Sequence, residues 1–417
     1  MNGIKLFKVR QHFDAPVVDD LVGRVRGEVG SLLNSYQPEP GSRVGITAGS
    51  RGVSDAVEVY RAAVVALREE GHEPFLFSAM GSHGGGTAEG QRDLLRSLGV
   101  MEEKIGAPVL CSDEVVEIGE TGAPLSGLPV YVAKEAAEAD IILAVNRVKP
   151  HTSFHGPYES GLMKMLAVGM GRADGATMVH RLGWGSMVEA VESIGSAVLE
   201  RMPILGGLAV VENAREETAL LEGLAADDLP KGETPLLDLA RGYMPALPVK
   251  ELDLCVVSEM GKNYSGTGMD TNIIGRLRLQ GIPEPSEPAI QYLAVLDLSE
   301  ASHGNATGVG LADFTTERLV EKIDRGATYL NCLTSGGPAR AAIPMTLETD
   351  EALFEAAWKA LKPERPEEIR MTVVENTLRL EDLWVSESLV DELGDEAEVL
   401  AGPLPLEFDS DGRMRCL

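Results

Sequence analysis

Four of the chain's seven histidines lie in glycine-rich or helix-breaking segments, where a side chain can meet a ligand. His83 lies in GSHGGGT, His151 and His155 lie in KPHTSFHG, and His180 ends GATMVH. No HExxH or paired-cysteine spacing makes these residues a closed zinc site. Because imidazole gives or takes a proton near neutral pH, the set favours proton transfer. Taken alone, His83 is better explained as a polar loop residue, although the three glycines that follow it would let the backbone approach a ligand closely.

Lys164 follows this histidine loop within the apolar segment SGLMKM. We expect a helix to begin near Tyr158, which would surround Lys164 with small or apolar neighbours. One interpretation is a lysine whose stem lies on the core while its amine reaches water. The other is a partly desolvated amine suited to covalent chemistry, with room for a bulky group. Glycines at positions 161, 169 and 171 favour the second interpretation, because glycine weakens a helix unless space is needed.

Arg51 stands in AGSRGVSD, a glycine-rich turn that precedes a predicted helix. Its guanidinium could hold a substrate carboxylate through two hydrogen bonds. It could equally be a surface arginine, and the turn lacks the full spacing of either common nucleotide-binding fingerprint.

The composition limits the class of protein. Asp and Glu number 65 against 37 Lys and Arg, so the formal net charge is −28, which argues against binding to nucleic acid or anionic membranes. The opening residues lack the apolar region of a signal peptide, and no apolar run approaches the roughly 20 residues of a membrane helix. The scattered cysteines predict reduced thiols in a cytoplasmic protein.

Strand-like and helix-like segments alternate along the chain, which predicts α/β domains with mainly parallel sheets. A length of 417 residues predicts two domains, and we place their boundary near residue 245, giving 1–245 and 246–417. Predicted strands are 43–49, 73–81, 140–146, 252–261, 291–304, 325–337 and 366–377, and predicted helices are 53–71, 87–99, 131–139 and 350–361. The region 202–250 gives a mixed pattern.

Polar, glycine-rich loops follow several of the predicted strands. Ligands bind beside the carboxyl ends of strands in open α/β sheets. We therefore expect the following residues at that edge of their sheets: Arg51, His83, His151, Lys262 and His303. With two domains, the expected active site is the cleft between them.

In this order, TAGSRG, GSHGGGT, KPHTSFHG, SGLMKM and GATMVH resemble the lactate racemase family, whose members use a nickel-pincer nucleotide. The resemblance implies that Lys164 bears the cofactor covalently through a thioamide and that His180 binds the nickel. It also implies that His83 and His151 are the two catalytic histidines, and that Arg51 holds and polarises the substrate.

The implied activity is that of an isomerase, a racemase or epimerase that inverts the hydroxyl-bearing carbon of a small 2-hydroxy acid. One histidine would remove the hydroxyl proton while hydride passes to the cofactor. Hydride would then return to the other face of the keto acid, and the opposite histidine would reprotonate the oxygen. The implied cofactor is pyridinium-3-thioamide-5-thiocarboxylate mononucleotide with nickel, so the implied partners include the enzymes that make it.

The chain also departs from the family pattern. A longer loop before Lys164 leaves His155 as a rival to His151 for the second base. Gly275 and Arg278 stand where lactate-specific members have glutamine and lysine, which predicts a substrate other than lactate. Candidate substrate-binding residues in this part are Lys262, Asn263 and Asn272, although Lys262 and Asn263 could simply belong to a solvated loop.

Two other functions remain open from the sequence. A zinc-dependent hydrolase could use His83, His151 and His180 as ligands, with Glu159 as the nearest carboxylate base. A non-catalytic protein could bind or store the cofactor or a sugar acid.

Overall fold

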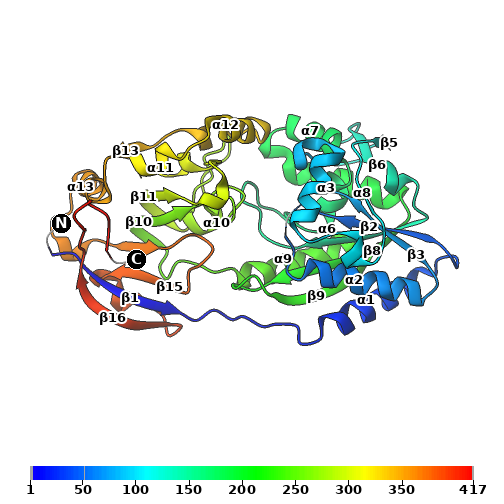
Figure 1. Cartoon of the computed structure of the whole chain (residues 1–417), viewed down its shortest axis with the longest axis horizontal. Coiled ribbons are helices and arrows are strands. Elements are labelled where there is room, and N and C mark those ends of the chain that lie inside the picture. Colours follow the sequence, from blue (N-terminus) through cyan, green and yellow to red (C-terminus); the bar gives the residue numbers. More distant parts are fainter. Residues whose placement is uncertain (1–2, 51, 416–417) are drawn as a thin grey trace. The chain divides into compact units, whose positions relative to one another are not determined.

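The computed structural model describes residues 3–50 and 52–415, which form two compact units (Figure 1). The N-terminal unit consists of residues 14–244, and the C-terminal unit consists of residues 1–13 together with 245–417. Both units contain multi-stranded, mainly parallel sheets with helices, so the predicted fold class is confirmed. The cleft expected between the domains stays a prediction.

The sheet of the N-terminal unit has six strands in the order β4-β3-β2-β7-β8-β9. All neighbours are parallel except β8 and β9. The strands are β2 (Arg43–Ala48), β3 (Glu73–Ser78), β4 (Val109–Leu110), β7 (Ile141–Arg147), β8 (Ile204–Glu212) and β9 (Thr218–Ala225). A separate hairpin is formed by β5 (Val115–Glu120) and β6 (Pro129–Ala133), followed by α5 (Lys134–Ala137).

Helices cover both faces of this sheet, because its strands are apolar on both sides. In β7, Ile141, Leu143 and Val145 belong to one core cluster, while Ile142 and Ala144 belong to another. The first cluster includes side chains of α1 (Leu21–Tyr36), α2 (Ala56–Glu69), α3 (Ala88–Ser97) and α4 (Glu102–Ile105). The second includes side chains of α6 (Leu162–Lys164), η2 (Met165–Gly169), α7 (Arg172–Arg181), α8 (Met187–Arg201) and α9 (Leu229–Tyr243).

The strand order reverses between β2 and β7. From β2 the chain proceeds to β3 and β4 on one side, and then returns to add β7 and β8 on the other. At such a switch point the loops that leave the carboxyl ends of the two neighbouring strands diverge and open a crevice for ligands. The topology therefore directs attention to the loops after β2, β3 and β7.

The sheet of the C-terminal unit has eight strands in the order β13-β12-β11-β10-β14-β15-β1-β16. Its first five strands are parallel to one another, and the three remaining pairings are antiparallel. The strands are β1 (Lys5–Gln11), β10 (Glu251–Met260), β11 (Ala289–Leu298), β12 (Phe314–Thr316), β13 (Met345–Leu347), β14 (Met371–Val374), β15 (Asp382–Ser386) and β16 (Ala397–Pro405). The helices are α10 (Thr271–Ile274), α11 (Glu317–Glu321), α12 (Arg325–Thr334) and α13 (Asp350–Leu361).

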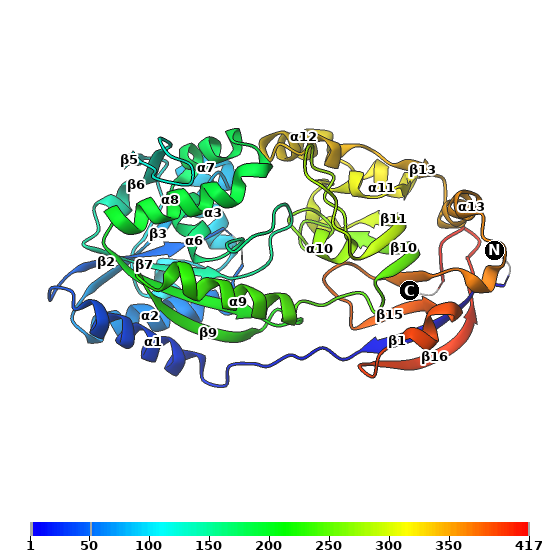
Figure 2. The same cartoon turned by 180° about the vertical axis from the view of Figure 1, so that it is seen from behind.

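Strand β1 precedes the N-terminal unit in the sequence, whereas all the other strands of this sheet follow that unit. It lies between β15 and β16 and pairs antiparallel with both, as Figures 1 and 2 show. The sheet of the C-terminal unit is therefore built from two segments that a whole unit separates in the chain.

Several local predictions are wrong. The predicted strand 325–337 is helix α12, whose N-terminus is capped by Asp324 through the amide of Ala327 at 3.0 Å. Only Thr328 and Cys332 of α12 are buried, and exposed Leu330 and Leu333 obscured that helical spacing. The predicted helix 131–139 is mostly the end of β6 and the short α5, and the mixed region 202–250 contains β8, β9 and α9.

Within the two described ranges, no helix has both the length and the apolar character that crossing a bilayer requires.

Candidate active site

Three loops lie at the switch point, while the candidate residues Lys164 and His180 lie on the helical segments that follow the last of them. The β2 loop contains Ser50, the β3 loop contains His83, and the β7 loop contains His151. Arg51, the predicted substrate clamp, lies outside the described residues. Ser50 Oγ and His83 Nδ1 form a hydrogen bond, so the β2 and β3 loops are joined at the candidate base.

The loop after β7 is closed at its neck. Lys149 and Ser160 form a small antiparallel bridge, with the two amides donating at 2.8 and 3.1 Å. Just inside this neck, Glu159 is fully buried and accepts from the amides of His151 at 2.6 Å and Gly156 at 3.0 Å. One carboxylate thus holds both ends of the loop that presents His151.

Glu159 also engages the rival histidine. His155 Nδ1 lies 3.3 Å from the Glu159 carboxylate, and Arg241 Nη2 donates to it at 2.6 Å. Burial alone would raise the pKa of Glu159, but these hydrogen bonds and the amides of His151 and Gly156 lower it. His155 is therefore bound to a charged structural partner, which favours His151 as the residue available to a substrate.

His151 lies against two aromatic rings. Its ring centre is 4.4 Å from that of Phe154 and 6.3 Å from that of Trp184, the first residue of η3 (Trp184–Ser186). The amide of Ser153 donates to His151 Nδ1 at 3.1 Å. In the neutral ring the hydrogen therefore sits on Nε2, which makes Nε2 a hydrogen-bond donor.

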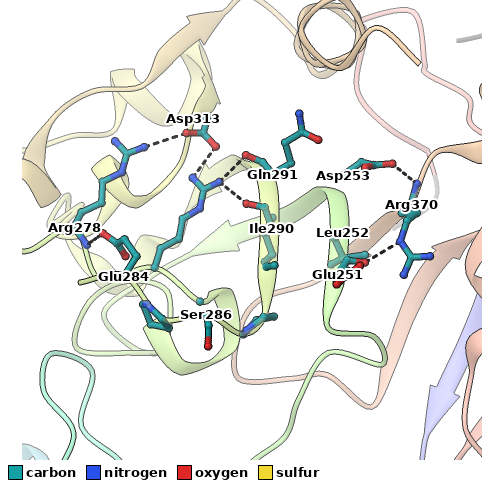
Figure 3. Close-up of a pocket in the computed structure, with 15 residues that line it drawn as sticks. Glu251, Leu252, Asp253, Arg278, Glu284, Ser286, Ile290, Gln291, Asp313 and Arg370 are labelled. Atoms are coloured by element: carbon teal, nitrogen blue, oxygen red, sulfur yellow. Dashed lines mark hydrogen bonds and ion pairs between the residues drawn. The ribbon is translucent and has the colours of Figure 1, made fainter. Parts of the chain in front are cut away.

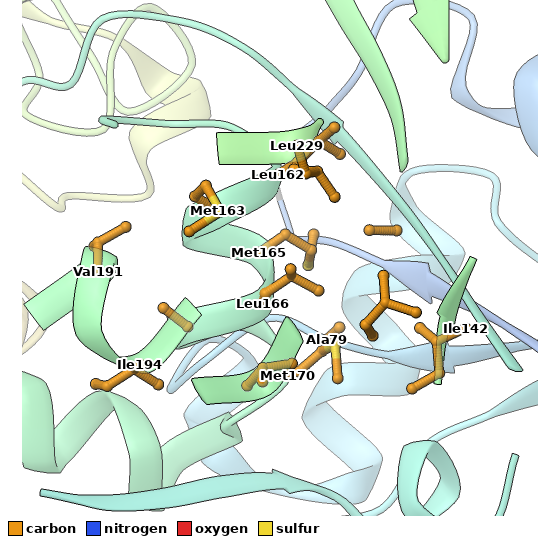
Figure 4. Close-up of a cluster of buried hydrophobic side chains, with 14 of the residues drawn as sticks. Ala79, Ile142, Leu162, Met163, Met165, Leu166, Met170, Val191, Ile194 and Leu229 are labelled. Atoms are coloured by element: carbon orange, nitrogen blue, oxygen red, sulfur yellow. The ribbon is translucent and has the colours of Figure 1, made fainter. Parts of the chain in front are cut away.

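Lys164 ends the short helix α6, which continues into the π-helical turn η2. The apolar residues on either side of Lys164 are buried in the core, as Figure 4 shows for Met163 and Met165. Lys164 itself is half-buried, and its Nζ lies 5.3 Å from the centre of the Phe154 ring. A well-packed segment thus presents this amine beside the aromatic neighbours of His151.

The glycines around Lys164 have a different role from the predicted one. A Cβ at Gly161 would lie 2.4 Å from Glu233 Oε1, and a Cβ at Gly169 would lie 2.8 Å from the carbonyl oxygen of Ala79. These glycines therefore allow other parts of the protein to approach the Lys164 segment closely. The helix also begins at Leu162 and not near Tyr158 as the sequence predicted.

His180 lies near the end of α7 and completes the cluster. Its ring centre is 5.8 Å from that of Trp184. Burial lowers the pKa of His180, and the positive charge of Lys164 lowers it further. The imidazole is therefore neutral at pH 7, which is the form that binds a metal ion.

The His83 loop rests on the same helical segment. The amide of Gly81 donates to the carbonyl of Gly169 at 3.2 Å, and a Cβ at Gly86 would lie 3.1 Å from that of Ala173. The structure thus gathers His151, Lys164 and His180 around Phe154 and Trp184, and it places the His83 loop against the turn between Lys164 and His180.

A buried arginine fixes the start of α7. Arg172 is fully buried and forms an ion pair with Glu135 at 2.8 Å. Its guanidinium also donates to Ser112 Oγ at 2.5 Å, to the carbonyl of Glu114 at 2.8 Å and to Ser78 Oγ at 3.1 Å. Arg172 therefore ties the helix of His180 to the end of β3 and to the β5–β6 hairpin.

Glu233 on α9 is a second buried acid near Lys164. Its Oε2 accepts from the amide of Met163 at 2.8 Å, while Oε1 is buried without a hydrogen-bond partner. Burial raises the pKa of Glu233 to about 7, although the amides of Met163 and Leu162 act in the opposite direction.

This raised pKa predicts a pH-dependent stability difference between wild type and Glu233→Gln. The pKa is about 7 in the folded protein and 4.5 in the reference state, so folding binds a proton between these values. Wild type should lose stability relative to the variant as pH rises from 4.5 through 7, by up to about 3 kcal/mol. Urea unfolding at pH 5, 6, 7 and 8 measures this difference, and a constant difference across the series would contradict the prediction.

No group of three or more His, Cys, Asp and Glu side chains in residues 3–50 and 52–415 is arranged to hold a metal ion. The zinc-hydrolase alternative required His83, His151 and His180 to share one ion. The arrangement gives that alternative no support.

The candidate substrate residues of the C-terminal unit lie after β10. Lys262 Nζ donates to the carbonyl of Gly266 at 2.5 Å and to Asn331 Oδ1 at 2.8 Å. Asn272, in α10, donates through its side-chain amide to Asp270 at 2.9 Å. Lys262 thus connects its loop to α12, and its role in substrate binding stays a prediction.

A cavity of about 630 Å³ lies at the opposite edge of this sheet, where β10 and β11 begin (Figure 3). Its lining includes Gly275 and Arg278, the two residues on which the expectation of a substrate other than lactate is based. Arg278 and Arg276 both pair with Asp313, at 3.0 and 2.6 Å. Two of the cavity's arginines are thus paired with one of its acids, and the position of the cavity separates Arg278 from Lys262.

Sequence reasoning missed Phe154, Trp184 and Glu233, and it considered Glu159 only as the base of a zinc-dependent hydrolase. Phe154 and Trp184 lie between the candidate residues, and Glu159 and Glu233 hold the segments that present them. The available signal was the aromatic residue within each histidine-containing segment, at positions 154 and 184.

No family model and no curated protein matches the sequence. Among solved structures, the chain is similar in fold to the lactate racemase apoprotein from Thermoanaerobacterium thermosaccharolyticum, with 10% identity and a TM-score of 0.54 over 88% of this chain and 93% of that one. A Thermotoga maritima protein solved by a structural genomics consortium is 14% identical, with a TM-score of 0.47 over 68% of this chain and 71% of that one. The first similarity shows a shared fold.

Proposed function

We propose that this protein is a racemase or epimerase of a 2-hydroxy acid other than lactate, which works with a nickel-pincer nucleotide attached to Lys164. The observation on which the proposal depends is the cluster of His151, Lys164 and His180 around two aromatic rings at the switch point of the sheet. The fold shared with a lactate racemase apoprotein supports it.

The residues present fit such a group. Lys164 would supply a half-buried amine for the covalent bond, and His180 would supply a neutral imidazole as a nickel ligand. The rings of Phe154 and Trp184 offer apolar faces to a flat aromatic cofactor. When bound, the cofactor supplies a reversible two-electron acceptor for the hydrogen on the substrate's carbon.

The two candidate histidines differ in how their protons are held. The amide of Ser153 keeps the hydrogen of the neutral His151 ring on Nε2, so His151 gives a proton to a substrate oxygen only after Nδ1 has gained one and this hydrogen bond has broken. His83 bonds to the hydroxyl of Ser50, which can donate or accept, so His83 can hold its proton on either nitrogen and take one from a hydroxyl. A base and, once His151 is protonated, an acid are thus present together, as inversion of a hydroxyl-bearing carbon requires.

His151 and His155 should respond differently to replacement by glutamine. His151→Gln removes the proposed proton donor, so we expect kcat to fall by about 10²–10⁴-fold. His155→Gln keeps a hydrogen-bond donor for Glu159, so we expect a far smaller change. Initial rates of inversion on the protein loaded with cofactor measure both, and equal losses in the two variants would contradict the assignment.

The proposal is tested by producing the chain together with the enzymes that make the cofactor. We expect intact-mass spectrometry to show an adduct on Lys164, and chiral chromatography to show inversion of at least one acid in a panel of single-enantiomer 2-hydroxy acids. A lactate racemase loaded in the same host serves as the positive control. If that control is loaded while this chain stays unmodified, the proposal is wrong.

A loaded chain that inverts no acid in the panel would instead indicate a protein that binds or stores the cofactor. A deuterium label on the substrate's carbon separates the chemistry further. We expect the label to stay in the product, because the carbon's hydrogen is returned and not exchanged with water.

A further inference from the structure

The carboxylate of Glu233 contacts the start of the segment that contains Lys164. Glu233 belongs to the first half of α9, far from Lys164 in sequence, and its side chain is completely buried. Its Oε2 accepts from the amide of Met163, the residue before Lys164, at 2.8 Å. The proton-transfer residues described above make no use of this acid.

The contact acts as a helix cap supplied from another element. The first amides of a helix have no partner within it, and a side chain just before the helix commonly accepts from them. Here the preceding residue is Gly161, which has no side chain to offer. Glu233 takes that place by accepting from the amide of Met163.

Gly161 is the residue that admits this cap. A Cβ at position 161 would lie 2.4 Å from Glu233 Oε1 and 2.6 Å from its Cδ. Any larger residue there would push the carboxylate away from the amides. Gly161 and Glu233 therefore form a matched pair.

The same turn is fixed from its other side. The carbonyl of Gly161 accepts from Asn146 Nδ2, at the end of β7, at 2.7 Å and from the amide of Met165 at 2.9 Å. Asn146 and Glu233 thus hold the peptide units on both sides of Leu162. The backbone from which Lys164 projects is held by the central sheet and by α9 together.

Glu233 is a costly residue to bury in this position. Among the described residues it forms no ion pair, and its Oε1 has no hydrogen-bond partner. A buried acid without a cationic partner destabilises a fold, and a glutamine or an apolar residue would avoid that cost. The hydrogen bond that Glu233 accepts from the amide of Met163 explains why an acid is buried at this position.

We propose that Glu233 is a positioning residue for the Lys164 amine: its carboxylate caps the Lys164 segment and keeps the amine beside Phe154. The proposal deepens the proposed function, because cofactor attachment at Lys164 is what this positioning would serve.

The test measures the reactivity of Lys164 in cofactor-free, full-length protein. A short pulse of an acetylating ester, followed by peptide mass spectrometry, gives the labelling rate of Lys164 relative to exposed Lys231 on α9. Glu233→Ala should let the start of the segment fray, so we expect Lys164 to label at least fivefold faster than in wild type. Glu233→Gln keeps an acceptor for the amides, so its rate should stay within twofold of wild type.

Two further variants separate positioning from general loss of stability. Leu236→Ala removes a buried side chain one turn along α9 without touching the cap, so it should leave the relative rate within twofold of wild type. Gly161→Ala displaces the carboxylate without removing it, so it should raise the rate as Glu233→Ala does, and it replaces that variant if Glu233→Ala does not fold. An unchanged rate in the folded cap variants, or an equal rise in Leu236→Ala, would overturn the proposal.

The labelling result and the proposed function can fail separately. An adduct on wild-type Lys164 with unchanged labelling in the cap variants would refute only the positioning role. No adduct in a co-production sample whose control is loaded, together with faster labelling in the cap variants, would refute only the proposed function.

Discussion

Lys164→Ala, produced together with the cofactor-making enzymes, should carry no adduct and should invert no 2-hydroxy acid. The amine is the only atom of this side chain that can form the thioamide, and it lies 5.3 Å from the centre of the Phe154 ring. We expect activity to fall by about 10³-fold or more, the scale seen when an essential covalent group is removed. Intact-mass spectrometry and chiral chromatography on the same sample measure both effects.

Lys164→Arg provides the matched control for charge. It keeps a cation that can lie over the Phe154 ring, but a guanidinium cannot supply the required amine. We therefore expect it to be as inactive as Lys164→Ala. Lys231→Ala, which removes an exposed lysine of α9, should load and react like wild type. Inversion that survives in Lys164→Ala would exclude the proposed attachment and point to a different class of enzyme.

Arg172→Met should destabilise the protein by about 3–5 kcal/mol, because it leaves Glu135 and several buried acceptors without their cation. The methionine fills much of the volume, so the loss reports the broken ion pair and hydrogen bonds more than a cavity. Urea unfolding followed by circular dichroism measures the change, which we expect to fall on the N-terminal unit that contains Arg172.

Two control variants show whether the loss of stability in Arg172→Met comes from the buried ion pair. Arg96→Met removes an exposed arginine whose ion pair with Asp93 spans 3.7 Å, and it should cost less than about 1 kcal/mol. Adding Glu135→Gln to Arg172→Met should restore part of the lost stability, since no carboxylate is then left without a partner. Equal costs for Arg172→Met and Arg96→Met would show that the buried cluster contributes little.

The layered part of the fold could be predicted because its pattern is local. Buried strands such as 140–146 and 252–261 are continuous apolar runs that end in glycine-rich loops, and the helix 350–361 has a clear apolar stripe. Segment 325–337 was wrongly predicted to be a strand, because large apolar residues lie on the exposed side of α12 and hide its helical pattern. The pairing of β1 with β15 and β16 could not be predicted from the residues of these strands, because strand order depends on contacts between segments far apart in the sequence.

Part of the candidate site could be predicted, namely the side chains whose type alone indicates the chemistry they can perform. Imidazoles and a lysine in helix-breaking segments mark His151, Lys164 and His180 without any structure. The residues that hold them could not be found in this way. Glu159 and Glu233 look like ordinary acids in a chain with 65 Asp and Glu, and only the fold shows which of them are buried against loop amides.

The position of β1 between β15 and β16 also has a consequence for biosynthesis. Residues 5–11 leave the ribosome long before residues 382–405. The segment of β1 therefore stays without its partner strands β15 and β16 while the N-terminal unit is made. An unpaired strand invites aggregation, and charged side chains along it discourage this. Lys5, Lys8 and Arg10 would protect the waiting strand in this way, and the same cations finally meet Glu387 and Asp382 in the completed sheet.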